Sequence, residues 1–143
     1  MSLENSVKAA LEAGGHFATL GTAADHAAAL SNISGLPLPA AYIIFGDYED
    51  APNIHIGQIV QQRTETIIVR YAVGNAAEAL GGSAMDEARS ADDAIRAALH
   101  GLEVDGYEPM ETSGGALIGY DRGTLWRDAF FIARTYYDAT PHS

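Results

Sequence analysis

The sequence contains no cysteine in its 143 residues. This absence excludes disulfide bonds, zinc–thiolate centres and a cysteine nucleophile, and it fits a reducing compartment. No apolar run near the amino terminus is long enough for a signal peptide, and no stretch approaches the roughly 18 apolar residues of a membrane span. We therefore expect a soluble protein made in the cytosol, with one domain over residues 1–143.

Basic side chains are also scarce. Eight lysines and arginines stand against nineteen aspartates and glutamates, for a formal net charge of -11. A protein that grips nucleic acid needs a basic stripe to displace the counterions of phosphates, and this chain cannot supply one. Lys8 is the single lysine, so the other basic residues are arginines. Arginine forms bidentate pairs at protein interfaces, but a genome rich in G and C would give the same bias.

Apolar periodicity predicts three helices. One has its apolar face at Leu3, Val7, Ala10 and Leu11 and ends at the glycine pair 14–15. A second covers about 22–31, where Thr22 and Asp25 form a capping-box-like start. The longest follows a glycine-rich segment at 74–82. Its apolar stripe at a period near 3.6 comprises Ala84, Ala88, Ala91, Ile95, Ala98, Leu99 and Leu102.

Four strands are expected between and after these helices. Residues 40–45 are apolar on both faces, as in a strand buried in mid-sheet, and the acidic stretch 46–53 that follows is typical of a loop. Residues 58–73 alternate, with one apolar face and one mixed face. Residues 116–120 and 125–137 form a hairpin around the turn at 121–123. The predicted fold class is α/β, of the α+β kind, with a single mixed or antiparallel four-stranded sheet flanked by helices.

Catalytic and ligand-binding patterns are missing from the sequence. The five histidines show no His-x-x-His or His-Glu-x-x-His spacing, and the acidic segment 47–50 lacks the spaced ligands of a calcium loop. No glycine pattern forms a phosphate cradle, and no Gly-x-Ser-x-Gly elbow is present. We therefore expect no catalytic residues, no cofactor and no metal, and a protein that is not an enzyme.

Three stretches in order along the chain carry a family resemblance: residues 38–44, residues 61–71 and residues 101–130. The last contains an Asp-x-Gly-x-Leu-Trp turn at 121–126 that leads into an aromatic, tyrosine-rich final strand. The chain resembles the tail terminator (tail completion) proteins of long-tailed phages, in particular the minor tail family of Mu-like and lambda-like prophages. It departs from that family at residues 101–106, where a tryptophan and a second proline are common.

The resemblance implies a structural protein of the virion tail that assembles in the cytoplasm of the bacterial host. Such proteins form a ring, expected to be a hexamer, that caps the tail tube, stops further addition of tube protein and presents a surface to the head connector. The implied partners are copies of the chain, the tube protein and the connector, while DNA only passes through the lumen. An acidic lumen would let DNA pass without adhering, because like charges repel.

Two groups of residues are candidates for contacts. Tryptophan, tyrosine and arginine are favoured interface anchors, so a subunit interface is predicted at Arg70, Trp126, Phe130, Arg134 and Tyr136. The alternative for Trp126 and Phe130 is that they are plain core residues. A partner-contact loop is predicted at Asp47, Tyr48, Glu49 and Asp50. Two alternatives stay open: another neck subunit, such as a head-closure protein, and a small ligand-binding or hydrolytic α/β domain.

Overall fold

The computed structural model describes residues 2–30, 36–74, 82–121 and 123–139. Along the chain the elements are α1 (Leu3–Gly14), β1 (Thr19–Thr22), α2 (Ala23–Leu30), β2 (Ala40–Asp50), β3 (Ile59–Val73), α3 (Gly82–Leu99), β4 (Glu111–Asp121) and β5 (Thr124–Ala139). The three predicted helices are confirmed. The capping interaction at α2 is also present, because the Thr22 backbone N–H donates to Asp25 Oδ2 at 2.8 Å.

All strands join one sheet in the order β1-β2-β3-β5-β4. The pairs formed by β2, β3, β5 and β4 are antiparallel, whereas β1 is parallel to β2. The mixed sheet is confirmed, but it has five strands where four were predicted. The additional strand, β1, is only four residues long and alternates too briefly to be recognised; its pairing with β2 makes it a strand.

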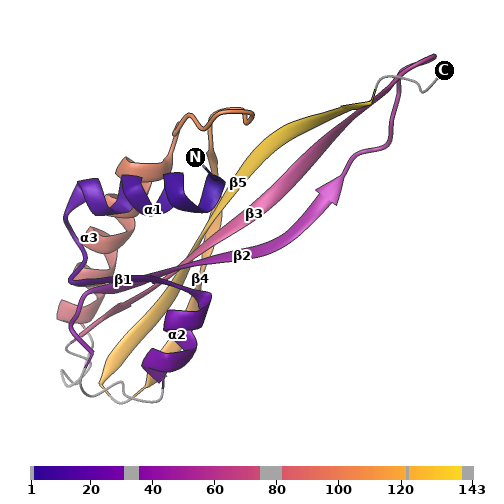
Figure 1. The fold of residues 1–143 in the computed structure, drawn as a ribbon. Helices are drawn as coiled ribbons and strands as arrows, with labels where there is room; N and C mark the ends of the chain where they lie inside the picture. Colours follow the sequence, from indigo (N-terminus) through magenta and orange to yellow (C-terminus); the bar gives the residue numbers. More distant parts are fainter. Residues whose placement is uncertain (1, 31–35, 75–81, 122, 140–143) are drawn as a thin grey trace.

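The main core lies between the sheet and two helices. In Figure 1, α1 and α3 lie together on one side of the sheet, which we call the helix face. The stripe of α3 is buried there as predicted, with Ala84, Ala88, Ala91, Ile95 and Leu99 fully enclosed. Leu102 lies beyond the end of α3, contrary to the prediction, yet it still packs against this core. The helix face of β3 carries Ile67, Val69, Tyr71 and Val73, all buried.

The opposite side of the sheet, the outer face, carries the mixed residues of β3. Of the described helices only α2 packs there, and it contacts β1 and β2 at one end of the sheet. It covers a small second core of Ala40, Tyr42, Ala72 and Trp126. Past the helices, β2, β3 and β5 run on together (Figure 1), so the outer face continues without helical cover into this extension.

The extension corrects the prediction of an acidic loop at 46–53. Residues 47–50 belong to β2, where Tyr48 pairs with Glu65 and Asp50 pairs with Arg63 of β3. A register shift between Phe45 and Tyr48 accommodates the glycine of the stretch. Pairing with β3, which the local composition does not reveal, thus overrides the poor strand propensity of these residues. We call residues 47–65 of β2, β3 and their connection, together with 133–139 of β5, the arm.

The predicted hairpin is confirmed in β4 and β5. Its first strand begins at Glu111, earlier than predicted, and two register shifts interrupt its pairing with β5. Gly123 of the turn has φ 79°, a conformation that glycine adopts readily, and Arg122 lies outside the described residues.

Candidate subunit interface

The outer face is ordered in rows that cross the central strands. From α2 towards the arm these rows are Ala40–Ala72–Trp126, Tyr42–Arg70–Asp128, Ile44–Ile68–Phe130, Thr66–Ile132, Glu49–Thr64–Arg134 and Gln62–Tyr136. Four of the five predicted interface residues, Arg70, Phe130, Arg134 and Tyr136, therefore share this face with Trp126, each in a different row. Alternation along β3 and β5 places them together.

Trp126 lies inside the subunit. Only 4% of its surface is exposed, and its ring lies 5.4 Å from His26 of α2 and 6.3 Å from Tyr42, centroid to centroid. The alternative explanation of Trp126 as core thus accounts for its position, and we leave it out of the proposed contact. His26 also packs edge-on against Tyr42 at 5.3 Å. Burial lowers the pKa of His26, and the nearby Arg70 lowers it further.

The next row holds a nearly buried ion pair. Arg70 donates from Nε and Nη2 to the two carboxylate oxygens of Asp128, at 2.8 and 2.9 Å. The Asp128 side chain is 5% exposed and that of Arg70 28%. The hydrogen bonds to Asp128 raise the pKa of Arg70. Arg70 is therefore committed to a partner within its own subunit, which sequence analysis did not anticipate because the pairing depends on strand register.

The central rows of the outer face are apolar and half-buried. Ile44, Ile68, Phe130 and Ile132 fall in this class, and they carry no charge. Two glycines flank them. A Cβ at Gly46 would lie 3.4 Å from Ile68 and 3.5 Å from Thr66, while Gly114 pairs with Phe130. Of the described helices only α2 packs on the outer face, against β1 and β2, so these rows form an apolar surface without helical cover.

On the arm the outer face becomes polar. Arg134 contacts Glu111 at 2.8 Å, and the Tyr136 hydroxyl donates to Glu108 at 2.9 Å while accepting from Gln62 at 3.0 Å. The hydrogen bond to Glu108 raises the pKa of Tyr136. Tyr136 remains 52% exposed. Of the predicted interface residues, it offers the largest accessible surface.

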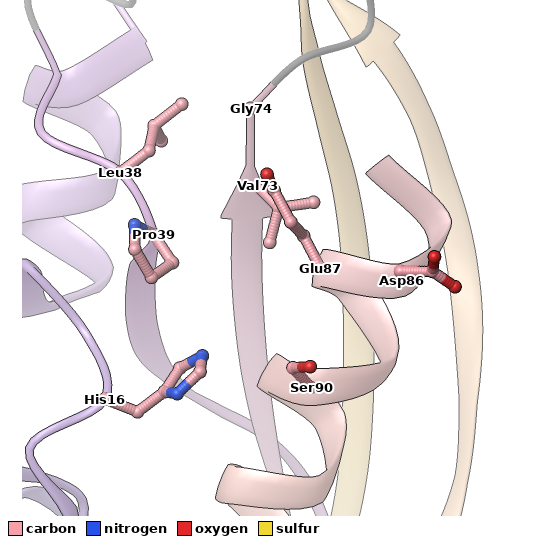
Figure 2. Close-up of a pocket in the computed structure, with 8 residues that line it drawn as sticks. All are labelled: His16, Leu38, Pro39, Val73, Gly74, Asp86, Glu87 and Ser90. Carbon is pink, nitrogen blue, oxygen red and sulfur yellow. The ribbon is translucent and has the colours of Figure 1, made fainter. Parts of the chain in front are cut away.

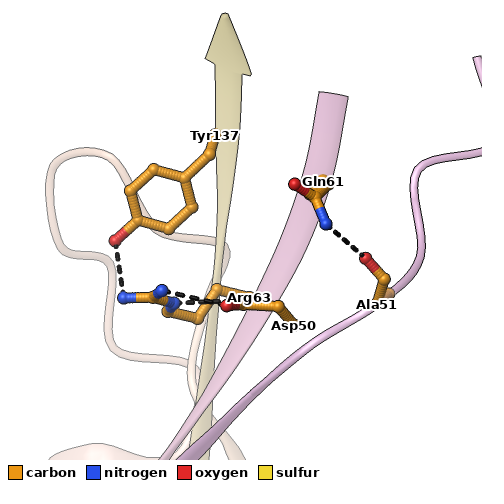
Figure 3. Close-up of polar contacts among 5 residues, drawn as sticks. All are labelled: Asp50, Ala51, Gln61, Arg63 and Tyr137. Carbon is orange, nitrogen blue, oxygen red and sulfur yellow. Dashed lines mark hydrogen bonds and ion pairs between the residues drawn. The ribbon is translucent and has the colours of Figure 1, made fainter. Parts of the chain in front are cut away.

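The predicted partner-contact residues Asp47, Tyr48, Glu49 and Asp50 lie on the arm. Asp50 accepts from Arg63 Nε at 2.6 Å and from Nη2 at 3.0 Å, and Arg63 lowers its pKa. Figure 3 shows the Arg63 guanidinium between Asp50 and Tyr137, whose hydroxyl accepts from Nη1 at 3.1 Å. The same guanidinium lies 3.9 Å from the centre of the Tyr48 ring. Arg63, which was not predicted to have a role, thus links β2 to β5 within the arm.

The tip of the arm is apolar and exposed. Ile54 is 85% exposed, Ile56 100% and Ile59 50%. The connection that carries the first two is nevertheless well hydrogen-bonded. The Asn53 amide donates to the carbonyls of His55 and Gln58, and its oxygen accepts from the backbone N–H of Val60 at 3.0 Å. The isoleucines are therefore presented by an organised turn.

Among the described residues, the cavities found are not lined by a recognisable catalytic set of side chains. One of about 540 Å³ lies between α3 and the start of β2 and is lined by His16, Leu38, Pro39, Val73, Gly74, Asp86, Glu87 and Ser90. Figure 2 shows the imidazole of His16 well away from the carboxylate of Asp86, which lies on the far side of the helix. Within residues 2–30, 36–74, 82–121 and 123–139 no group of three or more His, Asp or Glu side chains is placed to hold a metal. None of the described helices is long and apolar enough to cross a membrane.

A family profile described as phage tail terminator protein matches residues 2–137, nearly the whole chain. The chain belongs to the phage tail terminator family. The tail terminators are structural virion proteins, and the resemblance found in the sequence is thereby confirmed. None of the curated proteins matches this terminator significantly.

Among solved structures, the terminator is similar to a chain in the virion of a native gene transfer agent (GTA) particle. The two share 16% identity and a TM-score of 0.56, over 95% of this chain and 96% of that one. At this identity the likeness shows a common fold.

Proposed function

We propose that this tail terminator forms a ring, expected to be a hexamer, on the end of the tail tube. The ring stops further addition of tube protein and provides the surface to which the head connector attaches. It is assembled in the cytoplasm of the bacterial host and stays in the virion. The subunit acts by binding and carries no catalytic activity.

The observation that carries this proposal is the family match over residues 2–137, together with an uncovered apolar sheet face. A ring needs contacts that repeat from subunit to subunit and close. The rows of Ile44, Ile68, Phe130 and Ile132 supply apolar surface for such a contact, and Tyr136 extends it onto the arm. Aromatic residues of this kind are favoured at the centre of interfaces.

The charge of the chain supports a role around DNA without binding it. At a net charge of -11 per subunit, a ring repels the phosphates that pass through its lumen. DNA is thus a passenger in this proposal, while the tube protein and the connector are the binding partners. A solved ring with a strongly positive lumen would contradict this part of the proposal.

Native mass spectrometry and negative-stain microscopy of the purified protein, alone and with tail tubes, test the ring. We expect rings of one size, either for the protein alone or once tail tubes are added. Thr66→Glu places a charge in the central rows and is expected to prevent them, whereas Met85→Glu, on α3 at the helix face, serves as the matched control. A strict monomer in both conditions, or turnover of a small molecule in the 540 Å³ cavity, would overturn the proposal.

A further inference from the structure

A ring contact of the kind proposed above is heterologous: one surface of a subunit meets a different surface of its neighbour. The central rows of the outer face are one of the two surfaces. The other must be exposed, apolar and compatible with a partner that is itself strongly acidic. The inference that follows rests on the proposed ring and concerns which part of the neighbour provides this second surface.

The arm tip meets these requirements. Its isoleucines, Ile54 and Ile56, are the two most exposed large apolar side chains of the described residues. Charged residues make up 19% of the chain, yet residues 51–62 contain no Asp, Glu, Lys or Arg. Two copies with a net charge of -11 each repel one another, and an uncharged tip can approach a second copy with less repulsion than most of the surface.

Hydrogen bonds and an ion pair within the subunit hold the tip of the arm in place. Its turn is fixed by the hydrogen bonds of the Asn53 side chain, and the stem behind it by the Arg63–Asp50 ion pair. Cross-strand pairing of β3 with β5 continues as far as Ile59. Because the tip is already ordered, its docking costs less conformational entropy than the docking of a flexible loop.

The tip cannot reach the central rows of its own subunit. Ile68 lies nine residue steps beyond Ile59 on β3, or about 30 Å of extended strand. The strand between them is paired with β5 along its whole length and also with β2 from Arg63 onward, so it cannot fold back. Figure 1 shows the arm leading away from the helices into open space. A contact between tip and central rows therefore needs two copies of the chain.

The central rows suit contact with such an apolar, uncharged tip. They are uncharged, and the nearest arginines, Arg70 and Arg134, are paired with carboxylates of the same subunit. Gly46 and Gly114 leave the surface low beside Ile68 and Phe130. We propose that the arm tip of each subunit, Ile54 and Ile56, packs on the central rows of the next subunit and thereby closes the ring.

Engineered cysteines test this contact directly, because the natural chain has none. Ile56→Cys and Thr66→Cys in one chain are expected to give, under mild oxidation of the assembled ring, a ladder of disulfide-linked species up to the full ring. A mixture of the two single variants should give linked dimers only. Ile56→Cys combined with Ala13→Cys, on α1 at the helix face, is the matched control and should give no ladder.

A second variant tests how much the tip contributes to ring assembly. Ile54→Ser with Ile56→Ser removes exposed side chains only, so the subunit should keep its melting temperature. We expect the protein concentration for half assembly to rise at least about tenfold, because each isoleucine loses a buried contact. Asn53→Ala, which frees the turn while keeping both isoleucines, should give a smaller rise.

The outcomes separate the inference from the ring itself. Rings from the wild-type protein but no ladder from Ile56→Cys with Thr66→Cys would overturn the tip contact and leave the proposed ring standing. Intact rings of the double serine variant that fail to bind tail tubes would also overturn it and assign the tip to the tube. A wild-type protein that stays monomeric on tubes would remove the ring, and the tip contact with it.

Discussion

Two arginine–carboxylate pairs on neighbouring strands test how much burial adds to an ion pair of fixed geometry. Arg70 meets Asp128 through Nε and Nη2, and Arg63 meets Asp50 through the same two nitrogens. The four distances range from 2.6 to 3.0 Å. The pairs differ in burial, because the Asp128 side chain is 5% exposed and that of Asp50 37%.

Replacing Arg70 by alanine leaves the Asp128 carboxylate enclosed without a cation. Breaking a buried pair in this way costs about 3–5 kcal/mol. Since Arg70 itself is 28% exposed, water can enter, and we expect a loss of about 2–3 kcal/mol of unfolding free energy. For a chain of this size such a loss lowers Tm by roughly 8 °C. Replacing Arg63 leaves no buried charge without a partner, so the contribution of the Arg63–Asp50 ion pair to stability should be small.

The measurement is a pair of double-mutant cycles by urea denaturation, one with Arg70→Ala and Asp128→Ala, the other with Arg63→Ala and Asp50→Ala. The cycle isolates the coupling of each pair from the stacking of Arg63 on Tyr48 and Tyr137. We expect the coupling energy of the inner pair to exceed that of the outer pair clearly. Equal couplings, or a larger one for the outer pair, would refute the argument that burial decides.

Three further predictions follow from single features. Burial holds the pKa of His26 below 6.5, so the folded state binds a proton less readily than the unfolded state and stability falls as the pH drops through 6.5. His26→Phe should remove this loss, so the difference in Tm between variant and wild type should widen towards acid pH. Parallel profiles of Tm against pH would contradict this prediction. At the end of α1, a Cβ added to Gly14 would meet nothing within 4 Å, while Gly15 has φ 66°. In urea denaturation Gly14→Ala should raise the free energy of unfolding by about 0.5 kcal/mol, and Gly15→Ala should lower it by about 1 kcal/mol. Changes of the same sign in the two variants would refute the reasoning. Because subunits of net charge -11 repel one another, raising the salt concentration should strengthen ring formation in sedimentation experiments, and weaker assembly would indicate that intersubunit ion pairs dominate.

Much of the fold was accessible from local patterns. The stripe of α3 could be predicted because its buried residues recur at helical spacing, and the cap at Thr22 because its partner Asp25 is three residues away. Alternation also placed the two faces of β3 correctly. These features depend on neighbours within one element, which a sequence displays directly.

The missed features depend on partners distant in sequence. Strand β1 exists through its pairing with β2, and the acidic end of β2 through its pairing with β3. The bonds of Arg70 to Asp128 and of Arg63 to Asp50 span 58 and 13 residues, so they require the strand register. Trp126 could be assigned to the outer face by alternation, but its cover by α2 is a property of the tertiary structure alone.

The two arginines of the outer face explain why an acidic subunit would keep an apolar surface at the centre of its sheet. Arg70 and Arg134 lie on either side of the central rows, and each is neutralised by its own subunit's carboxylate, Asp128 or Glu111. A neighbouring copy that docks on the central rows therefore meets neither arginine as an unpaired cation that would also attract DNA. In the proposed ring, attraction at this surface comes from apolar contact, which would leave the negative charge free to face DNA in the lumen.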